Sequence, residues 1–212
     1  MLFTSERIAV VCTAPLVNVA FVKEKIKKYS SLIAVDGGAN HCYAMTLRPD
    51  LIIGDFDSID SHVLETYSGV PQKRYPIDKD ETDLELALEL VFHPKIEKIT
   101  VFGALGGRAD HALGNLILLS RYPGKVFFET ESEILFVIDK CTEISTKIGQ
   151  EISLIPLNGP VKGIESEGLK WPLKGKTLDK HFIGMCNQAT ASKVILSVAE
   201  GDLLCCINTP PN

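Results

Sequence analysis

The stretch DLIIGDFDSID (residues 50–60) runs from an apolar segment into a glycine and then places Asp55 and Asp57 two positions apart. A short apolar run bounded by turn-forming residues is typical of a fully buried strand. Both aspartates follow that strand directly. In open α/β sheets, ligands bind outside the carboxyl ends of the strands. The stretch therefore predicts a buried sheet with an acidic site at its edge, unless both aspartates serve only the turn.

The same alternation of apolar runs and helix-like segments continues through residues 1–130. Helical spacing of apolar residues over 82–92, preceded by a Thr82–Glu85 capping box, predicts one helix, and residues 109–122 predict a second. The expected strands cover residues 7–12, 32–38, 51–55, 99–104 and 125–130. This order predicts an α/β domain with a mostly parallel sheet.

From residue 131 onward the sequence changes to short β-type runs separated by Gly, Pro and Asn, as in EISLIPL (151–157) and VKGIES (161–166). No convincing helical pattern interrupts these runs. We therefore expect a second domain over residues 131–212, an antiparallel β-sandwich.

Composition excludes several classes of protein. A net charge of −5 argues against a nucleic-acid-binding surface, which needs a local surplus of Lys and Arg. No run of about eighteen apolar residues predicts a membrane span. The six cysteines include no C-x-x-C pair, which favours a reduced chain in the cytoplasm.

A second acidic cluster lies in PIDKDETDLELAL (76–88), where Asp78, Asp80, Glu81 and Asp83 surround Lys79. A helix N-terminus favours one or two acids, but four repel one another unless a cation is near. Carboxylate oxygens are the ligands that Mg²⁺ prefers. The cluster therefore points to Mg²⁺.

VFGALGGRADH (101–111) places Gly106 and Gly107 after a strand and before a helix. Glycines there let backbone N–H groups approach an anion, and Arg108 adds a planar fork suited to phosphate. The stretch predicts a phosphate-binding turn, and the alternative is a glycine-rich connection with a surface arginine.

Five stretches taken together resemble the thiamin pyrophosphokinase family. They are collinear and cover nearly the whole chain: DGGAN (36–40), RPDLIIGDFDSI (48–59), DKDETDLELAL (78–88), GALGGRADHALGN (103–115) and EGLKWPL (167–173). The resemblance implies transfer of the pyrophosphoryl group of ATP to thiamin with Mg²⁺. It also implies an α/β domain followed by a β-sandwich, in a homodimer whose active sites lie between subunits.

The resemblance also implies roles for individual residues. The expected metal ligands are Asp55, Asp57 and Asp83, and either Asp83 or Asp110 is expected to accept the proton of the thiamin hydroxyl. The residues expected to bind ATP and its phosphates are Asp36, Lys79, Asp80, Thr82, Gly106, Gly107 and Arg108. Trp171, the only tryptophan, is expected to stack on thiamin, and Asn187 is expected to bind thiamin as well.

Two stretches depart from the family pattern. CTAP (12–15) replaces an Asn-Gly type of turn after the first strand, and Cys186 stands before Asn187 where the family usually has a hydroxyl-bearing residue. Two other functions remain open. One is pyrophosphoryl transfer to a hydroxymethyl pterin, against which the GLKW stretch (168–171) argues. The other is a non-catalytic protein that binds a nucleotide or thiamin.

Overall fold

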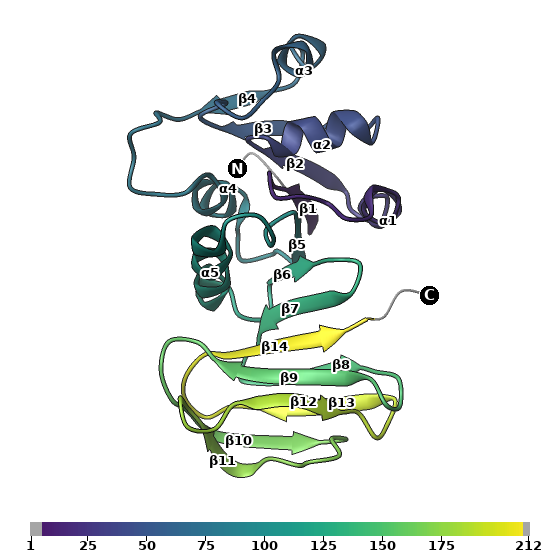
Figure 1. Cartoon of the computed structure of the whole chain (residues 1–212), viewed down its shortest axis with the longest axis vertical. Coiled ribbons are helices and arrows are strands. Elements are labelled where there is room, and N and C mark those ends of the chain that lie inside the picture. The colour runs from purple at the N-terminus through teal and green to yellow at the C-terminus, as the bar shows by residue number, and fades with distance from the viewer. Residues whose placement is uncertain (1–5, 210–212) are drawn as a thin grey trace. The chain divides into compact units, whose positions relative to one another are not determined.

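The computed structural model describes residues 6–209, which form two compact units, one ending at Asn115 and the other beginning at Leu116 (Figure 1). In the described part of the chain, no helix is long and apolar enough to cross a membrane.

The first unit is built on a sheet of five parallel strands. In the order β4-β3-β2-β1-β5, neighbouring strands pair in parallel. β1, β2 and β3 carry almost continuous apolar residues because helices cover both of their faces. The strands are β1 (Arg7–Val11), β2 (Ser31–Val35), β3 (Leu51–Gly54), β4 (Gln72–Arg74) and β5 (Lys98–Phe102).

Helices cover the two faces of this sheet separately. α1 (Val19–Ile26), α2 (Gly38–Ala44) and α3 (Ser61–Thr66) share one core cluster with alternate residues of β1 and β2. α4 (Asp83–Val91) contacts β2 and β3 from the other face, where it buries Leu84 and Leu88. α5 (Ala109–Leu118) follows β5 and continues into the 3-10 turn η1 (Leu119–Arg121).

The second unit is all-β beyond η1. One of its sheets has the strand order β12-β9-β14-β7-β6, and the other has the order β11-β10-β13-β8. Buried residues of both sheets form one core cluster, as in a β-sandwich. The strands are β6 (Val126–Glu129), β7 (Glu133–Val137), β8 (Cys141–Ser145), β9 (Glu151–Pro156), β10 (Val161–Glu167), β11 (Lys174–Leu178), β12 (Gly184–Gln188), β13 (Lys193–Ser197) and β14 (Leu203–Asn208).

The predicted fold class is confirmed, with an α/β unit of parallel strands followed by antiparallel β-structure. The capping box at the start of α4 is also present, because Thr82 Oγ1 accepts the N–H of Glu85 and Glu85 accepts the N–H of Thr82.

Candidate active site

A cavity of about 580 Å³ lies at the carboxyl ends of the parallel strands of the first unit. The sheet order places β2, β3 and β4 on one side of β1 and β5 on the other, so the loops after β1 and β5 diverge. Ligands of doubly wound sheets bind at such a switch point. The wall includes predicted site residues from four loops: Asp36, Asp55, Asp57, Lys79, Thr82, Asp83, Gly106, Gly107 and Arg108.

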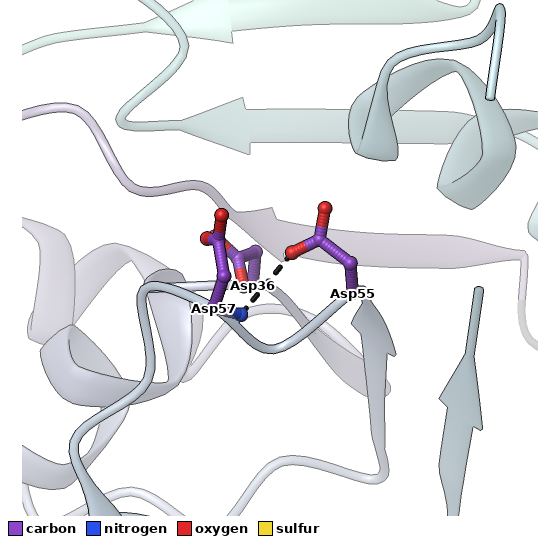
Figure 2. Close-up of side chains that lie close together, drawn as sticks. All are labelled: Asp36, Asp55 and Asp57. Carbon is purple, nitrogen blue, oxygen red and sulfur yellow. Dashed lines mark hydrogen bonds between the residues drawn. The ribbon is translucent and has the colours of Figure 1, made fainter. Parts of the chain in front are cut away.

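Three carboxylates gather at this edge of the sheet. Asp36 follows β2, while Asp55 and Asp57 follow β3, and one ligand oxygen of each lies within 4.8 Å of the others. Their side chains point into the same space (Figure 2). Asp36 is only 6% exposed, and its Oδ1 atom has no hydrogen-bond partner among residues 6–209. Buried oxygen atoms of this kind suit a hard divalent cation, so the three aspartates could hold a metal.

The backbone brings these carboxylates together. Gly54 has φ 144°, and a Cβ atom there would lie 3.0 Å from the Cβ of Asp36. Only glycine therefore allows β3 to end so close to Asp36. The N–H of Asp57 then turns back and donates to Asp55 Oδ1 at 3.1 Å, and Ser58 Oγ donates to Asp57 Oδ1 at 2.8 Å.

Lys79 forms ion pairs with one carboxylate of each acidic stretch, Asp55 and Asp83. Its ammonium group lies 3.2 Å from Asp55 Oδ2 and 3.2 Å from Asp83 Oδ1. Burial alone would raise the pKa of Asp55, but the N–H of Asp57 and the Lys79 ammonium together lower it. Burial raises the pKa of Asp83, against the pull of Lys79. Lys79 thus joins the loop before α4 to the acidic edge of β3.

Of the other residues predicted around Lys79, some line the cavity and some do not. Thr82 and Glu81 line the cavity, whereas Asp80 is exposed and lies outside its wall. Asp83 pairs with Lys79, and the group of three carboxylates contains Asp36 in its place. The roles assigned to Asp80 and Asp83 stay predictions.

The glycine-rich turn after β5 forms another part of the wall. Gly106 and Gly107 have φ values of 96° and 71°, a conformation that other residues rarely adopt. Arg108 reaches forward to Asp110 in the first turn of α5, donating from Nε at 3.1 Å and from Nη2 at 2.6 Å. The Arg108 guanidinium lowers the pKa of Asp110 to about 2.

The loop after β1, where the sequence departs from the family pattern, also lines the cavity. The N–H of Ala14 donates to Gly103 O at 3.1 Å, and His41 Nε2 lies 3.1 Å from Ala14 O. Thr13 and Pro15 complete this wall. The sequence assigned no role to Thr13, Ala14 or Pro15, and their signals were a position directly after the first strand and the departure of CTAP (12–15) from the family pattern.

In the second unit, the two residues expected to bind thiamin lie together. Trp171 is 53% exposed, and its backbone N–H donates to Asn187 Oδ1 at 3.1 Å. The buried Asn187 donates in return from Nδ2 to Trp171 O at 2.7 Å. Lys170 Nζ lies 4.7 Å from the centre of the indole ring. Asn187 therefore fixes the main chain that carries Trp171.

Comparison with known proteins agrees with this geometry. Residues 22–130 match the family description "Thiamin pyrophosphokinase, catalytic domain", and residues 138–203 match "Thiamin pyrophosphokinase, vitamin B1 binding domain". Thiamine pyrophosphokinase of Bacillus subtilis is 32% identical over 191 residues, which cover 81% of this chain and 84% of that protein. Thiamine pyrophosphokinase 2 of Arabidopsis thaliana is 30% identical over 206 residues, with 80% and 74% covered.

The fold agrees as well. The crystal structure of the Bacillus subtilis thiamine pyrophosphokinase superimposes with a TM-score of 0.83 and 25% identity, covering 96% of this chain and 99% of that one. The match extends over both units. The chain therefore belongs to the thiamin pyrophosphokinase family of enzymes.

Proposed function

We propose that this enzyme transfers the pyrophosphoryl group of ATP to the hydroxyl group of thiamin, giving thiamin diphosphate and AMP. The observation that carries the proposal is the cavity itself. It combines a buried, unpaired carboxylate oxygen of Asp36 with a glycine-rich turn at a helix N-terminus. A cation site facing an anion site is what a metal-bound triphosphate requires.

The proposed metal is Mg²⁺, held by Asp36, Asp55 and Asp57. When bound, it would neutralise the charge of the triphosphate and of the departing AMP. Arg108 and the N–H groups around Gly106 and Gly107 would orient phosphate oxygens. Because Arg108 is exposed and, among residues 6–209, its ion pair is with Asp110, it is free to exchange that carboxylate for a phosphate.

The reaction would form one bond and break one. The hydroxyl oxygen of thiamin attacks the β-phosphorus of ATP. The bond between the β-phosphorus and the oxygen that bridges it to the α-phosphate breaks, and AMP leaves with the bridging oxygen. The hydroxyl proton passes to a carboxylate. A carboxylate with a raised pKa is the stronger base, so the burial of Asp83 favours it over Asp110, whose pKa is about 2.

The thiamin site is proposed to lie in the β-sandwich domain, residues 131–212, with residues 1–130 as the nucleotide-binding domain. Trp171 would stack on thiamin, and Asn187 would hold Trp171 in place. We also propose a homodimer with active sites between subunits. In support, Trp171, Phe182, Ile183 and Met185 all expose apolar surface. Free cysteines at all six positions support a cytoplasmic location.

The choice of acceptor tests the proposed reaction. Thiamin and a hydroxymethyl pterin are each offered with Mg-ATP, and released AMP is measured by chromatography. We expect AMP to be released with thiamin and not with the pterin. Release with the pterin alone would assign the other pyrophosphokinase reaction, and no release with either would favour a binding protein.

Trp171→Ala is expected to raise the KM for thiamin about tenfold or more while changing the KM for ATP little, since stacking on a cation is worth about 1–2 kcal/mol. The same residue gives the binding signal, because thiamin should quench its fluorescence in a saturable way. Ile148→Ala, at another exposed apolar residue of this unit, serves as the control. Equal effects of the two variants on thiamin KM would contradict the stacking role.

A further inference from the structure

Phe56, between the two aspartates of β3's acidic turn, has a φ of 72°. This left-handed conformation is a genuine outlier for a bulky residue other than glycine. Such outliers persist only where the surrounding structure holds them, and they gather at functional sites.

The conformation of Phe56 determines how its two neighbours lie. If this residue were extended, the chain would carry Asp57 away from Asp55 by about 6.6 Å, the rise of two strand residues. Instead the chain turns back, so that Asp57 N–H reaches Asp55 Oδ1 at 3.1 Å. Both carboxylates then lie within 4.8 Å of each other and of Asp36 (Figure 2).

The side chain of Phe56 is held from two sides. Phe56 is only 5% exposed and belongs to the core cluster that contains Ile59 and Val63. The guanidinium of Arg74 lies 4.7 Å from the ring centre. Arg74 is on the exposed strand β4 and pairs in register with Gly54, so this contact lies beside the start of the turn.

We propose that Phe56 is a positioning residue for the divalent cation, and that Arg74 holds it in the left-handed conformation that aligns Asp55 and Asp57. The inference rests on the proposed function, because it needs the cation site. It explains why a buried aromatic residue occupies a position where glycine would be unstrained. Glycine would leave the two carboxylates without a fixed orientation.

A matched pair of substitutions separates backbone conformation from loss of the ring. Phe56→Leu and Phe56→Ile remove the ring equally and leave side chains of the same size, but Ile is β-branched and resists positive φ. We expect the dissociation constant for Mn²⁺ to rise about threefold for Phe56→Leu, which loses the contact of the ring with Arg74, and about tenfold or more for Phe56→Ile, which in addition resists the left-handed conformation. Mn²⁺ binding to the protein without nucleotide is measured from the loss of the free-ion EPR signal.

Arg74 is tested by the sign of its effect. Removing a cation near the site should by charge alone strengthen binding of a divalent ion. A positioning role predicts the opposite, so Arg74→Met is expected to weaken Mn²⁺ binding. Lys73→Met, at the neighbouring exposed residue of β4, removes the same charge and should leave binding unchanged or tighter.

The outcomes separate this inference from the proposed function. If wild type binds Mn²⁺ and the Leu and Ile variants bind it alike, the role of Phe56 is overturned while the cation site stands. If Arg74→Met binds Mn²⁺ as tightly as Lys73→Met, the role of Arg74 is overturned. If wild type fails to bind Mn²⁺, the cation site and this inference both fail. Thermal unfolding without metal confirms that each variant is folded.

Discussion

Asp57→Asn is expected to lower kcat about a hundredfold or more, with the fold intact. The substitution keeps the shape of the side chain but removes one negative charge from the group that Asp57 forms with Asp36 and Asp55. Asparagine can still accept the hydrogen bond that Ser58 donates at 2.8 Å, so the turn should survive. The loss would therefore fall on the cation and on the phosphates it gathers. The measurement is the initial rate over a range of Mg²⁺ concentrations, together with circular dichroism.

Asp60→Asn is the matched control for this experiment. Asp60 lies three positions further on, is exposed, and makes no side-chain bond to the N-terminus of α3. Asp60→Asn removes the same charge from the same region but leaves the carboxylates of Asp36, Asp55 and Asp57 unchanged. Near-normal activity of Asp57→Asn at saturating Mg²⁺, or an equal loss in Asp60→Asn, would remove Asp57 from the cation site.

The sequence predicted four of the five parallel strands, β1, β2, β3 and β5, because buried strands of an α/β sheet are continuous apolar runs. β4 (Gln72–Arg74) was missed because all three of its residues are exposed. α2 (Gly38–Ala44) and α3 (Ser61–Thr66) were not predicted. They span seven and six residues, too few for a helical period to stand out. β11 (Lys174–Leu178) was missed because four of its five residues are exposed, so it lacks the alternation of a half-buried strand.

The structure brings several of the predicted site residues to one edge of the sheet, and the roles assigned to them stay predictions. Asp55 and Asp57 could be grouped from their spacing alone. Asp36 joins them because β2 and β3 pair with Val35 opposite Ile53, which sets Asp36 beside Gly54. Pairing register between distant strands cannot be read from a single sequence. The left-handed φ of Phe56 was hidden for a related reason, since a phenylalanine gives no local signal for it.

Lys79→Met is expected to destabilise the first unit by about 1–2 kcal/mol in the absence of a divalent cation, because it breaks a half-buried ion pair and leaves two carboxylates uncompensated. Lys79 and Asp55 are each 11% exposed, and Asp83 is 21% exposed. Urea unfolding of wild type and variant gives the difference. Lys73→Met, on exposed β4, is the control and should change stability by less than about 0.5 kcal/mol.

Added Mg²⁺ and a lower pH should both reduce the loss of unfolding free energy that Lys79→Met causes. A bound divalent cation replaces the missing positive charge near Asp55, so Mg²⁺ should stabilise the variant more than wild type. In wild type, the pKa of Asp55 is below its ordinary value of 3.8, so its contribution is present above pH 3.8 and is lost as the pH falls through the lowered value. The pKa of Lys79 is raised above 10.5, so its contribution is lost only as the pH rises beyond that value.

Acid should stabilise the folded state of Lys79→Met, whereas it removes the contribution of Asp55 to the stability of wild type. Lys79 lowers the pKa of both Asp55 and Asp83, so its removal lets both values rise, and burial already raises that of Asp83. A group whose pKa is raised by folding stabilises the folded state at low pH and loses that contribution as the pH increases. Acidification from pH 7 toward pH 5 should therefore reduce the difference in unfolding free energy between variant and wild type. A gap that stays constant over this range, and that Mg²⁺ does not change, would show that Lys79 contributes packing rather than charge to this site.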